Sequence, residues 1–186
     1  MSGIVGSRFN IRGSGLVGSL GTDGQVFTSA GAGKSAVYED AAGGDNTPIF
    51  LIRQASATTG IATSTRTKID LDTADIDTDS GLDATNKRWT VPAGAGGTYA
   101  LVYGFRFESG DVFGGIDVNI YKNGTALCGT WGTNVSYNTW SNSFITTLVA
   151  TDYLELWVRQ ASGSNKNAST SDAGLLTYLG GSKLIT

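Results

Sequence analysis

The chain has 186 residues, of which 40% are hydrophobic and 16% charged, and its formal net charge at pH 7 is −3. This size allows one domain with an apolar core and a short appendage. Because no block of Lys or Arg is present, the basic surface of a nucleic-acid-binding protein is excluded. No apolar run approaches the roughly 18–20 residues that span a bilayer, so we expect no membrane insertion.

Two further features of the sequence bear on the class of protein and on its export. Histidine is absent, which removes the commonest general base and the commonest metal ligand. An enzyme would have to rely on carboxylates, lysine or tyrosine, so we expect a protein without enzymatic activity. The segment Met1–Arg12 lacks the charged-then-apolar pattern of a signal peptide, so we expect no export by that route.

Residues 1–45 differ in character from the rest of the chain. Glycines separate this segment into pieces of two to five residues, which are too short to build a core. Only Val26–Ser29 is predicted as a short strand. We therefore expect an extended segment that becomes ordered by packing against copies of itself or against a partner. The side chains it offers for such attachment are Ile4, Val5, Arg8, Phe9, Leu16, Val17 and Leu20.

Residues 46–186 show short strands at regular spacing, and no window favours a helix longer than one turn. The strongest hairpin signal is Asn123-Gly124. Many short strands at intervals of about 8–12 residues predict an all-β sandwich or barrel of antiparallel strands. The expected strands are Pro48–Ala55, Thr67–Leu71, Ala74–Asp77, Lys87–Val91, Thr98–Glu108, Val112–Tyr121, Thr125–Cys128, Ser143–Val149, Tyr153–Gln160, Leu175–Leu179 and Lys183–Ile185.

The stretch Lys87–Phe107 is predicted to be the centre of this fold. Alternate positions carry a broad, mostly aromatic face, which period two places on one side of a strand. That face consists of Tyr99, Leu101, Tyr103, Phe105 and Phe107. The opposite side is smaller and not very polar, so we expect this strand to be covered on both faces. Its residues are Ala100, Val102, Gly104 and Arg106.

The densest group of carboxylates is Asp75, Asp77 and Asp79. Alternating aspartates can gather oxygen ligands for Ca²⁺ along a strand edge, although the spacing does not match an EF-hand loop. The alternative is a solvated strand edge that its charge keeps from pairing with other chains. Calcium is the only cofactor the sequence suggests.

The stretch Thr130–Ser143 combines aromatic residues with amides and shows poor alternation, which indicates a loop between two strands. Aromatic rings can stack on the C–H faces of sugars while amides bind the hydroxyls. The candidate glycan-binding residues are Trp131, Asn134, Tyr137 and Trp140. The alternative is that Trp131 and Trp140 are core residues of neighbouring strands.

Several short motifs, taken in order, resemble the C1q-like globular head of the C1q and tumour-necrosis-factor superfamily. The central motif is Arg88–Pro92 (RWTVP), followed by Gly97–Leu101 (GTYAL). The resemblance implies a ten-stranded jelly-roll sandwich that assembles as a tight homotrimer, and it gives the aromatic face from Tyr99 to Phe107 a second possible role as trimer interface. The other motifs are Lys68-Ile69, Asp77, Leu82-Asp83, Lys122–Gly124, Asp152–Val158 and Tyr178–Gly181.

The N-terminal segment carries a second resemblance. Gly21–Ser29 (GTDGQVFTS) followed by Gly31–Gly33 (GAG) is similar to units that recur in bacteriophage tail-fibre and virion-appendage proteins. Together the two resemblances imply a structural virion protein, made in the host cytoplasm and assembled without export. The N-terminal segment would dock to other virion proteins, and the knob would contact a glycan or receptor on the host surface.

Two alternatives remain open from the sequence. The first is a capsid decoration protein, whose trimers would stabilise the phage head without recognising a host. The second is a polysaccharide depolymerase that uses paired carboxylates, with Asp117, Asp152 and Glu155 as candidates.

Overall fold

The protein is described from a computed structural model, which covers residues 25–28, 37–40, 46–56, 58–108, 113–135, 139–169 and 176–184. The chain divides into two compact units, residues 1–44 and 45–186. In the first unit, β1 (Gln25–Thr28) pairs with β2 (Val37–Asp40) in antiparallel fashion. The rings of Phe27 and Tyr38 lie 5.0 Å apart across this pair. The sequence predicted β1 but gave no signal for β2.

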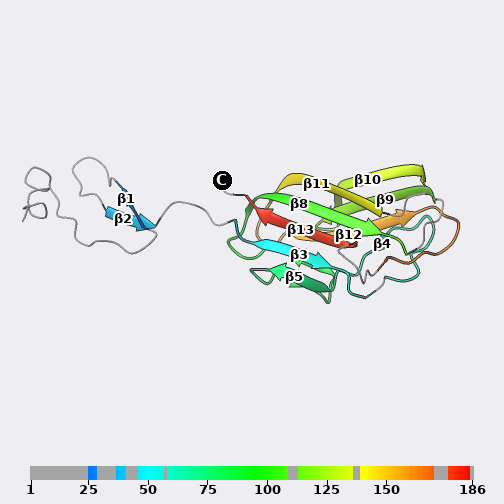
Figure 1. Ribbon diagram of the computed structural model, residues 1–186, viewed down its shortest axis with the longest axis horizontal. Coiled ribbons are helices and arrows are strands. Elements are labelled where there is room, and N and C mark those ends of the chain that lie inside the picture. Colours follow the sequence, from blue (N-terminus) through cyan, green and yellow to red (C-terminus); the bar gives the residue numbers. More distant parts are fainter. Residues whose placement is uncertain are drawn as a thin grey trace, which may run out of the picture. The chain divides into compact units, whose positions relative to one another are not determined.

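The second unit consists of strands and turns, with no helix among its described residues. One sheet has the strand order β10-β9-β12-β7-β6, with β4 also paired to β12, and the other has the order β11-β8-β13-β3-β5 (Figure 1). The bounds are β3 Ile49–Arg53, β4 Thr67–Lys68, β5 Thr73–Asp77, β6 Leu82–Asp83, β7 Arg88–Thr90, β8 Gly97–Arg106, β9 Phe113–Lys122, β10 Thr125–Val135, β11 Thr139–Leu148, β12 Tyr153–Gln160 and β13 Tyr178–Lys183.

The core lies between the two sheets and contains the aromatic face predicted from β8. Tyr99, Leu101, Tyr103, Phe105 and Phe107 are each at most 2% exposed. Their role as core residues is confirmed. The second role, as trimer interface, does not fit side chains that their own chain already covers.

The side chain of Trp89 on β7 packs against the opposite sheet. Its ring stacks on Phe50 of β3, with centroids 3.8 Å apart and planes 10° apart. Its Nε1 donates a hydrogen bond to Asp77 Oδ1 at 3.2 Å. A Cβ at Gly81 would lie 2.4 Å from this Nε1, so only glycine leaves room for the indole at that turn.

The strand boundaries differ from the predicted ones mainly around β10, β11 and β13. The Asn123-Gly124 hairpin is confirmed, and both residues have positive φ, as a two-residue turn requires. By contrast, the stretch predicted as a loop is largely strand, because β10 runs to Val135 and β11 begins at Thr139. β13 begins at Tyr178 rather than Leu175. Within the described residues, no helix is long and apolar enough to cross a membrane.

Candidate functional site

The outer face of the β11-β8-β13-β3-β5 sheet is apolar. Residues paired across antiparallel strands lie on the same face of a sheet. One such row crosses all five strands through Ser143, Val102, Gly180, Leu51 and Ile76. Gly180 has no side chain, so the sheet surface is depressed at the middle of this row, between the aliphatic side chains on either side.

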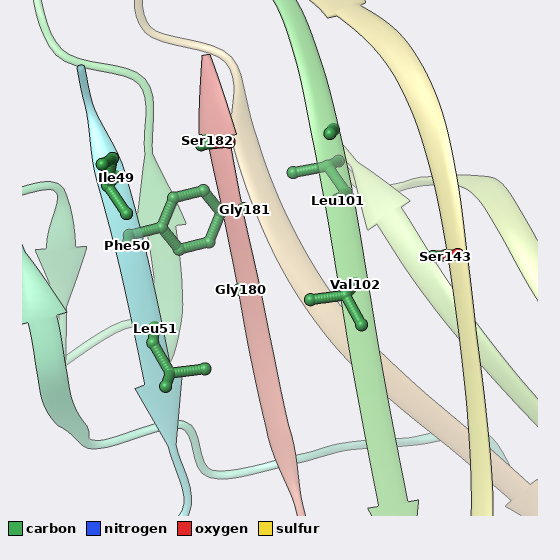
Figure 2. A pocket seen from close by; sticks show the side chains of 10 residues that line it. Ile49, Phe50, Leu51, Leu101, Val102, Ser143, Gly180, Gly181 and Ser182 are labelled. Carbon is green, nitrogen blue, oxygen red and sulfur yellow. The ribbon is translucent and has the colours of Figure 1, made fainter. Parts of the chain in front are cut away.

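A neighbouring row adds two more aliphatic side chains, Ile145 and Ile49, with the small residues Ala100 and Ser182 between them. Ile145 is 68% exposed, and Ile76, Val102 and Ile49 are 46%, 37% and 37% exposed. The two rows enclose a shallow apolar groove of about 430 Å³. Figure 2 shows Ile49 and Leu51 on one side of β13 and Val102 on the other.

Polar contacts border this apolar face at one end. The Arg53 Nε donates to the Asp75 carboxylate at 2.8 Å across β3 and β5. The Tyr178 ring lies over Gly104, where an added Cβ would approach its Cε1 to 2.4 Å. The face can therefore bind an apolar surface of matching shape. We define it as the apolar face, consisting of Ile49, Leu51, Ile76, Val102 and Ile145.

The outer face of the other sheet has a different chemistry. One row consists of Trp131 on β10, Asp117 on β9 and Arg159 on β12. Trp131 is 68% exposed. The Asp117 carboxylate accepts a hydrogen bond from Arg66 at 2.6 Å and another from Asn119 Nδ2 at 2.6 Å.

The next row consists of Gly129, Asn119, Trp157 and Lys68. A Cβ at Gly129 would lie 2.1 Å from Asn119 Oδ1, so the glycine allows the amide to lie flat against β10. Glu155 accepts from Lys68 Nζ at 2.9 Å and from Trp157 Nε1 at 3.0 Å. We define the residues of these two rows, together with Arg66 and Glu155, as the polar-aromatic face.

The structure separates the four candidate glycan-binding residues. Trp131 lies on the polar-aromatic face, whereas Trp140 belongs to the other sheet, opposite Phe105, and packs against the core. The core alternative therefore holds for Trp140 and is wrong for Trp131. Tyr137 and the side chain of Asn134 lie outside the described residues.

Asn119 and Trp157 were not predicted as site residues. Both stand in strands with regular alternation, so they gave no sign of a loop or motif. The available signal was that Trp157 and Tyr121 occupy the outward positions of two strands whose inward positions are aliphatic. Their rings lie 5.2 Å apart, which makes an aromatic contact on this sheet surface.

The three aspartates proposed as calcium ligands have separate contacts. Asp75 is ion-paired with Arg53, and Asp79 accepts from the Thr78 hydroxyl at 2.6 Å. Asp77 accepts from the backbone N–H groups of Gly81 and Leu82 at 2.9 and 2.8 Å. Among the described residues, no three carboxylate, Cys or His groups are placed to hold one metal ion. β5 is the edge strand of its sheet, as the alternative interpretation expected.

The three carboxylates considered for a depolymerase are all ion-paired. Asp117 pairs with Arg66 and Glu155 with Lys68. Asp152 lies 3.5 Å from Lys122 Nζ.

Burial raises the pKa of Asp152, but hydrogen bonds outweigh this effect. They come from the Val149 N–H at 2.9 Å and the Asn123 amide at 2.7 Å, and Lys122 adds its charge. The pKa of Asp152 therefore lies below its ordinary value of 3.8. A carboxyl held in its charged form by hairpin contacts suits a structural role.

The proposed virion-anchoring residues, from Ile4 to Leu20, lie outside the described residues.

Comparison with known proteins identifies the fold. No family model matches the chain, and no curated protein matches it. Among solved structures, murine APRIL at pH 8.0 is similar with a TM-score of 0.57 and 21% identity, over 73% of this chain and 98% of that one. The globular domain of zebrafish complement 1qA protein is similar with a TM-score of 0.50 and 12% identity, over 74% and 98%. The described residues between 46 and 184 thus form a jelly-roll sandwich of the C1q/TNF-like type.

Proposed function

We propose that this chain is a structural protein of a bacteriophage particle, without enzymatic activity, and that it assembles as a homotrimer through the apolar face. In this proposal the N-terminal segment attaches to other virion proteins, and the jelly-roll knob contacts the host surface. The observation that carries the assembly is the apolar face itself. A closed sandwich has already buried its core, so a second apolar surface has no role within one chain.

The apolar face has the chemistry of a protein–protein contact. Four of its side chains are more than one third exposed, and they come from four of the five strands of this sheet: Ile49, Ile76, Val102 and Ile145. Contiguous exposed apolar surface on this scale marks interaction sites, because covering it gains about 25 cal/mol for each Å². The sequence also predicts that β8 is covered on both faces. One chain covers only the side that carries Tyr99, which leaves Val102 to be covered by another chain.

Three copies are favoured because the C1q-like resemblance implies a trimer. The role in a phage particle is supported by the likeness of Gly21–Gly33 to units of tail-fibre proteins. A trimeric knob present in several copies per particle can bind a surface through weak single sites. Such multivalency raises overall avidity by about 10²–10⁴ without any further contact.

The oligomeric state tests the assembly. Light scattering of the purified full-length protein should give about 58 kDa, three times the chain mass of 19.3 kDa. Ile145→Asp should give a folded monomer, because a trimer would have to bury the unpaired aspartate charge in the contact between chains. Trp131→Asp is the matched control, since Trp131 is equally exposed at 68% but lies on the other sheet. A wild-type monomer, or a trimer in the Ile145→Asp variant, would contradict the proposal.

The place in the particle is tested separately by immunogold labelling of phage virions. Label at the tail or its fibres, combined with adsorption of the purified trimer to host cells, is the expected result. Label distributed over the head would favour the capsid decoration role instead. Absence of the protein from purified particles would end the virion proposal.

A further inference from the structure

We propose that the polar-aromatic face binds an acidic saccharide, with Trp131 as the stacking platform and Arg159 as the group that receives a sugar carboxylate. This inference rests on the host-attachment part of the proposed function and specifies its site and ligand class. The occupant is a carbohydrate chain that carries uronic-acid or similar carboxylates.

The exposed position of Trp131 supports a saccharide site. Its side chain is 68% exposed on a regular strand, where folding gains little from so large an apolar group. Two residues earlier on the same face, Gly129 has no side chain, and the Asn119 amide occupies the space that a Cβ would fill. An exposed indole beside such a flat amide offers a ring against which one face of a sugar can lie.

The polar groups beside Trp131 are already held in place. Asp117 is fixed by Arg66 and by the amide of Asn119, each at 2.6 Å. Asn119 is itself 9% exposed and lies against Gly129. Groups that their own contacts orient lose little conformational entropy when they bind hydroxyls, which favours recognition of a polar ligand.

The charge of the polar-aromatic face also favours an acidic ligand. The chain as a whole is acidic, yet this face carries three basic side chains, Arg66, Lys68 and Arg159, against two acidic ones. Arg66 and Lys68 are neutralised by Asp117 and Glu155. Among the described residues Arg159 has no ion-pair partner, and its Nε donates only to the Ser64 carbonyl, at 3.3 Å. A guanidinium in this position can donate two parallel hydrogen bonds to a carboxylate.

The placement of the face fits the proposed assembly. The two sheets pack against each other, so the polar-aromatic face and the apolar face are on opposite sides of the knob. When the apolar face is covered by neighbouring copies, the row of Trp131, Asp117 and Arg159 remains on the outside. A trimer then presents three identical sites to a surface of repeating saccharides.

The test uses the full-length wild-type protein on an array of neutral and uronic-acid-containing bacterial oligosaccharides. We expect binding to acidic members and loss of binding when the same oligosaccharides are carboxyl-reduced. For the strongest acidic member, Trp131→Ala and Arg159→Gln should each weaken binding by about tenfold or more. Trp131→Phe should retain part of the affinity because it keeps a ring. Ile145→Ala is the control, with equal exposure on the apolar face.

Two results would overturn this inference. One is an array without binding to any acidic oligosaccharide. The other is binding that Trp131→Ala and Arg159→Gln leave unchanged. Adsorption of the same proteins to host cells separates the two proposals. If wild type and Trp131→Ala adsorb equally, attachment stands and this site is wrong, whereas a wild-type trimer that does not adsorb removes the attachment role itself.

Discussion

Replacing Trp89 by alanine is the sharpest test of how the sandwich is held together. Its side chain is fully buried and stacks on Phe50 from the opposite sheet. A buried aromatic side chain covers roughly 150–250 Å², which at about 25 cal/mol for each Å² corresponds to about 4–6 kcal/mol. Buried Phe or Trp changed to Ala costs about 3–5 kcal/mol. We expect Trp89→Ala to lower the free energy of unfolding by that amount.

A second variant separates packing from hydrogen bonding at Trp89. Trp89→Phe can keep the stack on Phe50 but removes the Nε1 bond to Asp77, which is worth about 1 kcal/mol. We expect this variant to lose about 1–2 kcal/mol, including the smaller ring. Packing therefore outweighs the hydrogen bond, and the alanine variant must be much less stable than the phenylalanine variant.

Urea unfolding followed by circular dichroism, at a fixed protomer concentration, measures these losses. The concentration must be fixed because assembly adds to apparent stability. Trp131→Ala is the control, because a side chain that is 68% exposed should change stability by about 0.5 kcal/mol or less. A loss of less than about 1 kcal/mol in Trp89→Ala, or an equal loss in Trp131→Ala, would contradict this role of Trp89.

Three further predictions follow from particular contacts. Folding lowers the pKa of Asp152, so its stabilising contribution is complete above its pKa in the unfolded chain and is lost as the pH falls through its pKa in the folded protein. The difference in melting temperature between wild type and Asp152→Asn should therefore disappear on acidification, and a constant difference would contradict this. Burial, with a smaller effect of Asp79, raises the pKa of Tyr99 to about 12, so stability should fall between about pH 10 and 12, and Tyr99→Phe should remove that part of the loss. Gly104→Ala should cost about 1–3 kcal/mol, because the new Cβ meets the Tyr178 ring; in a Tyr178→Ala background the cost should largely disappear, and an equal cost in both backgrounds would show that the ring is not the obstacle.

Much of the fold could be predicted because burial on one face imposes period two on a strand. Tyr153–Gln160 was predicted with the bounds that β12 has, and the five buried residues from Tyr99 to Phe107 were placed in the core. The prediction was wrong where a strand has small and polar residues on both faces. In β10 and β11, Thr, Asn and Ser are as compatible with a loop as with a strand whose outer side meets water.

The candidate site was harder to predict because it depends on which strands become neighbours. Trp131 and Trp140 are nine residues apart and looked like one cluster, but the chain passes from one sheet to the other between them. The row of Trp131, Asp117 and Arg159 joins three segments that are distant in sequence. Only the pairing of β10, β9 and β12 brings these side chains together, and no local pattern records it.

The two outer faces of the knob differ for a physical reason that connects both proposals. An outward position on a strand normally carries a polar side chain, as Asp117, Asn119 and Arg159 do on β9 and β12, because no second layer of the protein covers it. On β8 and β3 the outward positions Val102, Leu51 and Ile49 are aliphatic, although Val102 and Ile49 are exposed and Leu51 is only half-buried. The alternation of side chains identifies the two faces of each strand. It does not show whether the outward face is covered by the same chain or by another molecule. Val102→Asp separates these cases, because it should abolish assembly while leaving the β-rich circular dichroism spectrum unchanged. If that variant unfolds while Ile145→Asp stays a folded trimer, the apolar face serves the single chain and not its assembly.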